Sequence, residues 1–231
     1  MTTAFAEDPV LQRHHHEDPL LENALRVSLH QAHQQALDNG WHHDVHTGEP
    51  LSPSPGQTFS LLHSELSEAL EAERKSLQDR HLPHRPGAEV EMADFLGRLL
   101  DYAGRHNLPL VERVLALLGF EATSSVDPNP ELGLTPNDAL LMEQGLRHAQ
   151  GVCYLTERAL HFDRELGHPI PATPEDLLAN LHRHTSRAFE LALAGGPTAT
   201  TDTLARMTLD ALEYGTQFDY DIPGAAVEKR E

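Results

Sequence analysis

The fold is decided by Leu62-His63-Ser64-Glu65-Leu66-Ser67-Glu68-Ala69-Leu70-Glu71 and by Glu91-Met92-Ala93-Asp94-Phe95-Leu96, two stretches of a 231-residue chain. Each stretch combines a pair of carboxylates at positions i and i+3 with apolar residues at helical spacing. Residues three apart lie about 60° apart around a helix and about one turn along it, so each pair occupies one side of its helix. The pattern therefore predicts two amphipathic helices whose apolar stripes pack together.

That packing would bring four carboxylates to one seam between the helices: Glu65, Glu68, Glu91 and Asp94. Negative groups at a partly buried seam repel one another and are costly to desolvate. A hard divalent cation removes this cost, because Mg²⁺ and Mn²⁺ prefer oxygen ligands. The alternative is two solvated acidic helix faces. Both pairs have the same offset from their apolar stripes, which favours a metal site.

Helical periodicity extends over most of the chain, and no run of residues alternates like a strand. We therefore predict an all-α helical bundle. The expected helices span residues 20–39, 58–79, 88–106, 108–118, 135 to about 166, 173 to about 195, and 200–214. The expected organisation is a flexible arm over 1–19, a helical domain with the acidic pairs over 20–120, a proline-rich linker over 121–134, a second helical unit over 135–218 and a loose tail over 219–231.

The charge of the chain limits its partners. Acidic residues number 36 against 17 lysines and arginines, which gives a formal net charge of −19. Such a surface repels nucleic-acid phosphates and anionic lipids, so we expect neither nucleic acid nor membrane as a partner. No apolar stretch approaches the roughly 18 residues of a membrane span, and the first residues do not have the pattern of a signal peptide. With Cys153 as the single cysteine, these features favour a cytoplasmic location.

The block from residue 39 to residue 102 resembles the MazG-like nucleoside triphosphate pyrophosphohydrolases, an all-α superfamily that includes the dimeric dUTPases. The family signature is ExxE followed, after a spacer, by ExxD. Here Glu65 and Glu68 match the first pair, Glu91 and Asp94 match the second, and the 22 residues between Glu68 and Glu91 fit the family spacing. The loop His81-Leu82-Pro83-His84-Arg85-Pro86-Gly87 is also similar to the family.

The resemblance implies a nucleotide pyrophosphohydrolase, a hydrolase that acts on a nucleoside triphosphate. Glu65, Glu68, Glu91 and Asp94 would bind Mg²⁺, for which Mn²⁺ could substitute. A metal-activated water would attack the α-phosphorus and release a nucleoside monophosphate and pyrophosphate. Glu65 or Glu68 is the candidate for the carboxylate that takes the proton of this water.

Five further residues are candidates for binding the substrate. The only tryptophan, Trp41, could stack on a base or serve packing alone. Lys75 and Arg85 belong to a small cationic group near the acidic pairs, and they could contact phosphate or form ordinary solvated surface. Arg98 and Asp101 lie on the same side of their helix as the second acidic pair, where they could support its carboxylates or form an ion pair.

The C-terminal half repeats the first half faintly. The segment Leu181-His182-Arg183-His184-Thr185-Ser186-Arg187-Ala188-Phe189-Glu190 aligns with residues 62–71, and Thr203-Leu204-Ala205-Arg206-Met207-Thr208 aligns with residues 91–96. The alignment replaces every expected ligand: Glu65 by His184, Glu68 by Arg187, Glu91 by Thr203 and Asp94 by Arg206. We interpret this as a tandem duplication whose second copy keeps its packing role, although chance similarity between amphipathic helices is the alternative. A homodimer and a monomer with an internal pseudo-dimer are both compatible with it.

Two other functions compete with the enzyme. A di-iron carboxylate bundle would require ExxH pairs, whereas both pairs in this chain end in a carboxylate. A non-catalytic binding or scaffold protein derived from a pyrophosphohydrolase bundle is the stronger alternative, because the second half has already lost the acidic residues.

Overall fold

The computed structural model describes residues 18–44, 46–51, 53–123, 147 and 173–229. Within these ranges the regular structure is helical, which confirms the all-α prediction. The described helices are α1 (Pro19–Asp38), α2 (Pro55–Lys75), α3 (Gly87–Arg105), α4 (Leu110–Leu118), α6 (Pro174–Leu193), α7 (Pro197–Phe218) and α8 (Ile222–Glu228). The predicted arm up to residue 17, most of the predicted linker and, apart from residue 147, the helix predicted over 135–166 lie outside the described residues.

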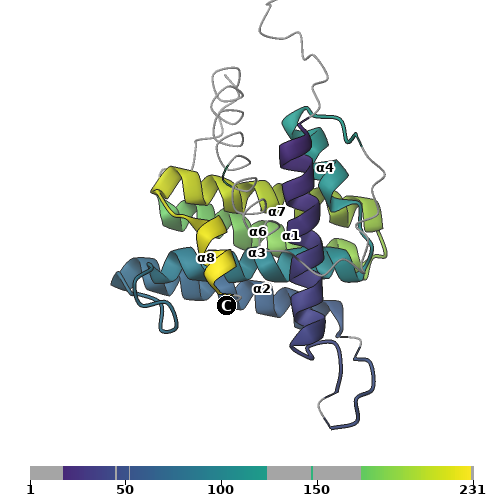
Figure 1. Ribbon diagram of the computed structural model, residues 1–231, viewed down its shortest axis with the longest axis horizontal. Helices are drawn as coiled ribbons and strands as arrows, with labels where there is room; N and C mark the ends of the chain where they lie inside the picture. Colours follow the sequence, from purple (N-terminus) through teal and green to yellow (C-terminus); the bar gives the residue numbers. More distant parts are fainter. Residues whose placement is uncertain (1–17, 45, 52, 124–146, 148–172, 230–231) are drawn as a thin grey trace, which may run out of the picture.

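Four helices form the centre of the bundle (Figure 1). α2 packs on α3, α6 packs on α7, and α2 also packs on α6. α1 crosses this group against α3, while α4 lies on α7 and α8 lies on α3. Buried residues of both halves, among them Phe59, Phe95, Leu178 and Tyr214, belong to one hydrophobic cluster. The two predicted helical units therefore share a core.

Proline and capping residues start the helices, as the sequence indicates. The Thr173 hydroxyl accepts a hydrogen bond from the backbone N–H of Asp176 at 3.2 Å, just before Pro174. At α2, Ser54 and Gln57 form a capping box around Pro55, so this helix begins three residues earlier than expected.

The expectation of a loose tail from Asp219 is wrong for the residues described. After a left-handed Asp219, the chain forms α8, in which Ile222 and Ala225 are fully buried. The Asp221 side chain caps this helix by accepting a hydrogen bond from the Gly224 N–H. Burial of Ile222 and Ala225 against the main core stabilises a helix too short to form alone.

The contacts of the two helix pairs correspond to one another. His63 on α2 stacks on His182 on α6, with ring centroids 5.1 Å apart, and these two residues are equivalent in the sequence alignment. Such self-matching contacts are typical of a two-fold interface. Glu65 binds Arg98 between α2 and α3, and the equivalent positions, His184 and Asp210, bind each other between α6 and α7.

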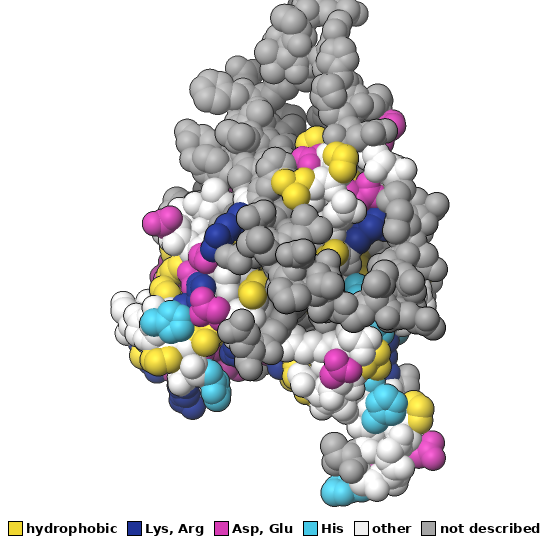
Figure 2. Space-filling model, in the orientation of Figure 1, with side chains coloured by type: hydrophobic (Ala, Val, Ile, Leu, Met, Phe, Trp, Pro, Cys, Tyr) yellow, Lys and Arg dark blue, Asp and Glu magenta, His cyan; other side chains and the backbone are white. Residues whose placement is uncertain are grey.

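The described helices give no support to a membrane span, since none of them is both long enough and apolar enough to cross a bilayer. On the face drawn in Figure 2, lysine and arginine side chains lie next to aspartate and glutamate side chains. Local pairs of opposite charge therefore occur on this surface despite the net charge of −19.

Candidate metal centre

The centre lies between α2 and α3. Leu62 and Leu66 on α2 are fully buried, and Glu65 between them is only 5% exposed. α3 begins at Gly87, where a side-chain carbon would lie 3.0 Å from the Ala72 methyl group. Glycine at this position permits the close approach of the two helices.

Three of the four predicted ligands meet. Carboxylate oxygens of Glu65, Glu91 and Asp94, called here the acidic cluster, lie within 4.8 Å of one another. Glu68 lies outside this set: its side chain is exposed and accepts a hydrogen bond from the Ser64 hydroxyl at 2.8 Å. The structure thus places the i, i+3 pair of α3 and the first glutamate of α2 within the reach of one cation.

Burial and mutual repulsion perturb the cluster. Burial, together with the negative charges of Asp94, Glu68 and Glu65, raises the pKa of the Glu91 carboxyl to about 8. Burial also raises the pKa of the Glu65 carboxyl, although Arg98 counteracts this effect. These shifts mean that the ionised cluster is unfavourable in the metal-free protein, which is the electrostatic condition that a divalent cation relieves.

Two cations already touch the cluster. Arg98 on α3 donates from Nε to the Glu65 carboxylate at 2.5 Å, and Lys229 at the end of α8 donates from Nζ to Asp94 at 2.9 Å. Glu91, in contrast, has no ion pair with any residue in the described ranges. Glu91 is therefore the carboxylate with the most to gain from a bound metal ion.

A pocket of about 400 Å³ is lined by Arg98, the partner of Glu65, and we call it the tryptophan pocket. Trp41, Leu61 and Tyr102 give it apolar walls, whereas Arg98 and Asp101 give it charged ones. The Trp41 side chain is 52% exposed, and the Arg98 guanidinium lies 5.4 Å from the centre of its ring. Three residues predicted to bind substrate, Trp41, Arg98 and Asp101, are thus brought together here.

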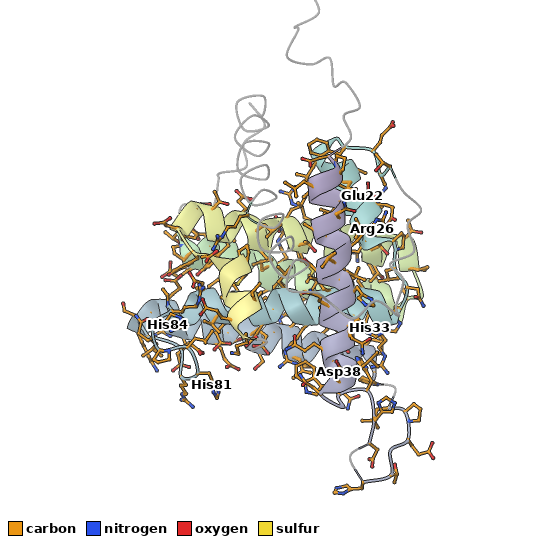
Figure 3. All side chains as sticks on the ribbon, in the orientation of Figure 1. Glu22, Arg26, His33, Asp38, His81 and His84 are labelled. Carbon is orange, nitrogen blue, oxygen red and sulfur yellow. The ribbon has the colours of Figure 1, made fainter. Side chains whose placement is uncertain are left out.

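Two histidines that the sequence does not indicate as site residues form hydrogen bonds with the Asp101 carboxylate. His33 on α1 (Figure 3) and His42 contact the same Asp101 oxygen at 2.8 and 2.9 Å. Arg105 lies against the other ring nitrogen of His42 at 2.8 Å. Since arginine only donates, that nitrogen accepts, and the nitrogen facing Asp101 carries the proton.

His33, His42 and Asp101 are close enough together to hold a metal ion by distance alone. The contact from Arg105 argues against such a site, because the His42 nitrogen facing Asp101 carries a proton and offers no lone pair. This group fits the positioning of Asp101 at the pocket wall. His33 on α1 and Asp101 are 68 residues apart in the sequence, so no local pattern predicts that they meet.

Lys75 and Arg85, the remaining candidates for substrate binding, lie elsewhere. Lys75 forms an ion pair with Glu71, which precedes it by one turn on the exposed side of α2. Arg85 is 12% exposed and binds Glu89 at 2.6 Å and Glu228 at 2.5 Å, which fastens α8 to the start of α3. Neither side chain lines the tryptophan pocket. His84, in the same loop (Figure 3), also contacts Glu228.

The comparisons with known proteins return no match: no family model, no curated protein and no solved structure is similar to the chain.

Proposed function

We propose that the protein is a Mg²⁺-dependent nucleotide pyrophosphohydrolase, which converts a nucleoside triphosphate to the monophosphate and pyrophosphate. The observation that carries the proposal is the convergence of Glu65, Glu91 and Asp94 from two helices, where Glu91 forms no ion pair within the described ranges. Three carboxylates form a donor set that fits Mg²⁺ or Mn²⁺. When bound, the metal ion supplies charge neutralisation for the triphosphate and activation of a water molecule.

Glu68 is the candidate general base. It lies one turn from Glu65 on α2, and its charge acts on Glu91, so it borders the cluster without belonging to it. A carboxylate outside the ligand set stays available to accept a proton from the attacking water. The Ser64 hydroxyl holds one Glu68 oxygen and thereby limits the rotation of this side chain.

The tryptophan pocket is the candidate site for the nucleoside. The Trp41 ring offers an exposed face on which a base can stack. Asp101, with one oxygen bound by His33 and His42, offers its second oxygen to an N–H or O–H group of the ligand. Arg98 lies against both Trp41 and Glu65, and therefore connects the pocket to the acidic cluster.

The test is pyrophosphate release from a panel of canonical and modified nucleoside triphosphates with Mg²⁺. Glu91→Gln and Asp94→Asn should lower turnover at least about a hundredfold, since each removes a charged ligand while keeping the side-chain volume. Glu71→Gln is the matched control, because Glu71 is an exposed acid on α2 that pairs with Lys75 and lies outside the acidic cluster. Full turnover in Glu91→Gln would contradict the assignment.

A scaffold or binding role is the second candidate, and one observation favours it. Arg98 and Lys229 already pair with two carboxylates of the cluster, as Arg206 pairs with Asp210 in the second half. A thermal shift separates the two functions. A non-hydrolysable nucleotide with Mg²⁺ should raise the unfolding midpoint of the enzyme, because it binds only the folded state. A midpoint that no nucleotide changes would favour the scaffold.

A further inference from the structure

We propose that the pocket between α1, α3 and α8 binds the pyrophosphate portion of the nucleotide through Lys229, and that this site opens when the charge of Asp94 is taken up by a metal ion. The inference rests on the proposed function for the identity of the anion. The evidence for the site is a pocket with two cations, Lys229 and Arg98, in its wall. The ion pair between Lys229 and Asp94 connects this pocket to the acidic cluster.

The pocket adjoins the acidic cluster, with which it shares Asp94. It has a volume of about 250 Å³ and is called here the lysine pocket. That volume is below the roughly 300–1,000 Å³ usual for drug-sized ligands, so it fits a small ligand. Gly97 lies in its wall, and a side-chain carbon there would meet nothing within 4 Å. Trp41 and Arg98 line both pockets and form the boundary between them.

The lining of the lysine pocket suits an oxyanion. Lys229 and Arg98 contribute positive charges, and Gln35 and Asn39 contribute amide groups that can donate hydrogen bonds. In the described part of the chain, neither amide side chain is engaged in a hydrogen bond. Charged donors on phosphate oxygens form some of the stronger hydrogen bonds in proteins. Among the described residues of the wall, Asp94 is the only acidic one.

Lys229 is placed by the C-terminal helix. Glu228, the residue before it, receives hydrogen bonds from Nε and from a terminal nitrogen of Arg85 at 3.0 and 2.5 Å. Glu89 accepts the backbone N–H of Asp221 at 2.7 Å at the other end of α8. Both ends of the helix are thus fastened to the α2–α3 unit, so the second half of the chain delivers a cation to the site of the first half.

In the metal-free protein the Lys229 Nζ forms an ion pair with the Asp94 carboxylate at 2.9 Å. A divalent cation on the Asp94 carboxylate would compete for this charge and release the ammonium group toward the pocket. The anion would then bind after the metal ion, with Lys229 exchanging a carboxylate oxygen for a phosphate oxygen. The same release should follow without metal when Asp94 is replaced by asparagine.

The test measures binding of inorganic pyrophosphate in EDTA by calorimetry, so that neither metal nor turnover contributes. Asp94→Asn should bind pyrophosphate about tenfold more tightly than the wild-type chain, the effect of one freed charged hydrogen bond. Glu68→Gln is the matched control, since it removes a neighbouring negative charge without releasing Lys229. Trp41, the only tryptophan, lines the pocket and gives a second, fluorescent readout.

Two double variants decide the role of Lys229. Asp94→Asn with Lys229→Met should lose the gain, and Asp94→Asn with Lys229→Arg should keep most of it, which separates charge from folding. A gain that persists with Lys229→Met, or an equal gain in Glu68→Gln, would overturn the proposal. Absence of turnover with every nucleotide would count against the proposed function alone, because pyrophosphate binding is measured independently.

Discussion

Replacing Glu91 by glutamine should stabilise the metal-free protein, and increasingly so as the pH rises. The Glu91 pKa is about 8 in the folded protein against an ordinary value of 4.5. Between these values the folded chain keeps a proton that the unfolded chain has lost. Stability falls with rising pH wherever the folded state binds more protons, so Glu91 destabilises the wild-type protein progressively from about pH 4.5 to pH 8. Glutamine carries no charge at any of these pH values.

The size of the effect follows from the same shift. At about 1.4 kcal/mol per pKa unit, the full difference corresponds to about 4–5 kcal/mol. Solvent reaches part of this half-buried side chain, so we expect about 1–3 kcal/mol at pH 8.5 and almost none at pH 5. For a chain of this size, each kcal/mol raises the unfolding midpoint by about 2–4 °C.

The assay is chemical denaturation of the wild-type chain and Glu91→Gln in EDTA at pH 5 and pH 8.5. Glu71→Gln, at the exposed end of α2, should show no comparable pH-dependent gain. Addition of Mg²⁺ should stabilise the wild-type protein at pH 8.5 and leave Glu91→Gln nearly unchanged. A difference between wild type and Glu91→Gln that is equal at both pH values would refute the electrostatic reasoning.

Four further outcomes follow from the packing and the ion pairs. Arg85→Met should cost about 3 kcal/mol in urea denaturation, because it leaves Glu89 and Glu228 without their shared cation. Leu62→Ala should cost about 2–5 kcal/mol by the same assay, since the side chain is fully buried. Burial lowers the pKa of His63 in the fold, so the unfolded chain takes up the proton first as the pH falls; His63→Gln should reduce the loss of stability between pH 7 and pH 5. Arg187→Met should leave Mg²⁺ binding, followed by calorimetry, unchanged, because Arg187 pairs with the exposed Glu190 and is no member of the acidic cluster.

The parts of the fold that the sequence predicts are those set by local spacing. The offset of Glu65 from Leu62 and Leu66 predicts the helix face on which this carboxylate lies, and the Thr173-Pro174 pair predicts the start of α6. Such patterns act over one or two helical turns, so they can be recognised without knowledge of the fold.

The parts that could not be predicted depend on contacts distant in sequence. Nothing near Lys229 indicates that it meets Asp94, 135 residues earlier. α8 is too short to show a periodic pattern in the sequence. The ion pair between Arg85 and Glu228 forms only when α8 packs on α3. Arginine suits phosphate, which is why the sequence favours Arg85 as a phosphate ligand, whereas in the fold the carboxylates of Glu89, Asp221 and Glu228 engage it.

A crystal structure of the full chain with Mn²⁺, measured for anomalous scattering, would show whether the acidic cluster between α2 and α3 holds a divalent cation. We expect a strong anomalous peak within coordination distance of Glu65, Glu91 and Asp94, with the Lys229 ammonium displaced from Asp94. A cluster without a peak while Arg98 and Lys229 keep their ion pairs, or a peak at His33 and His42 instead, would contradict it.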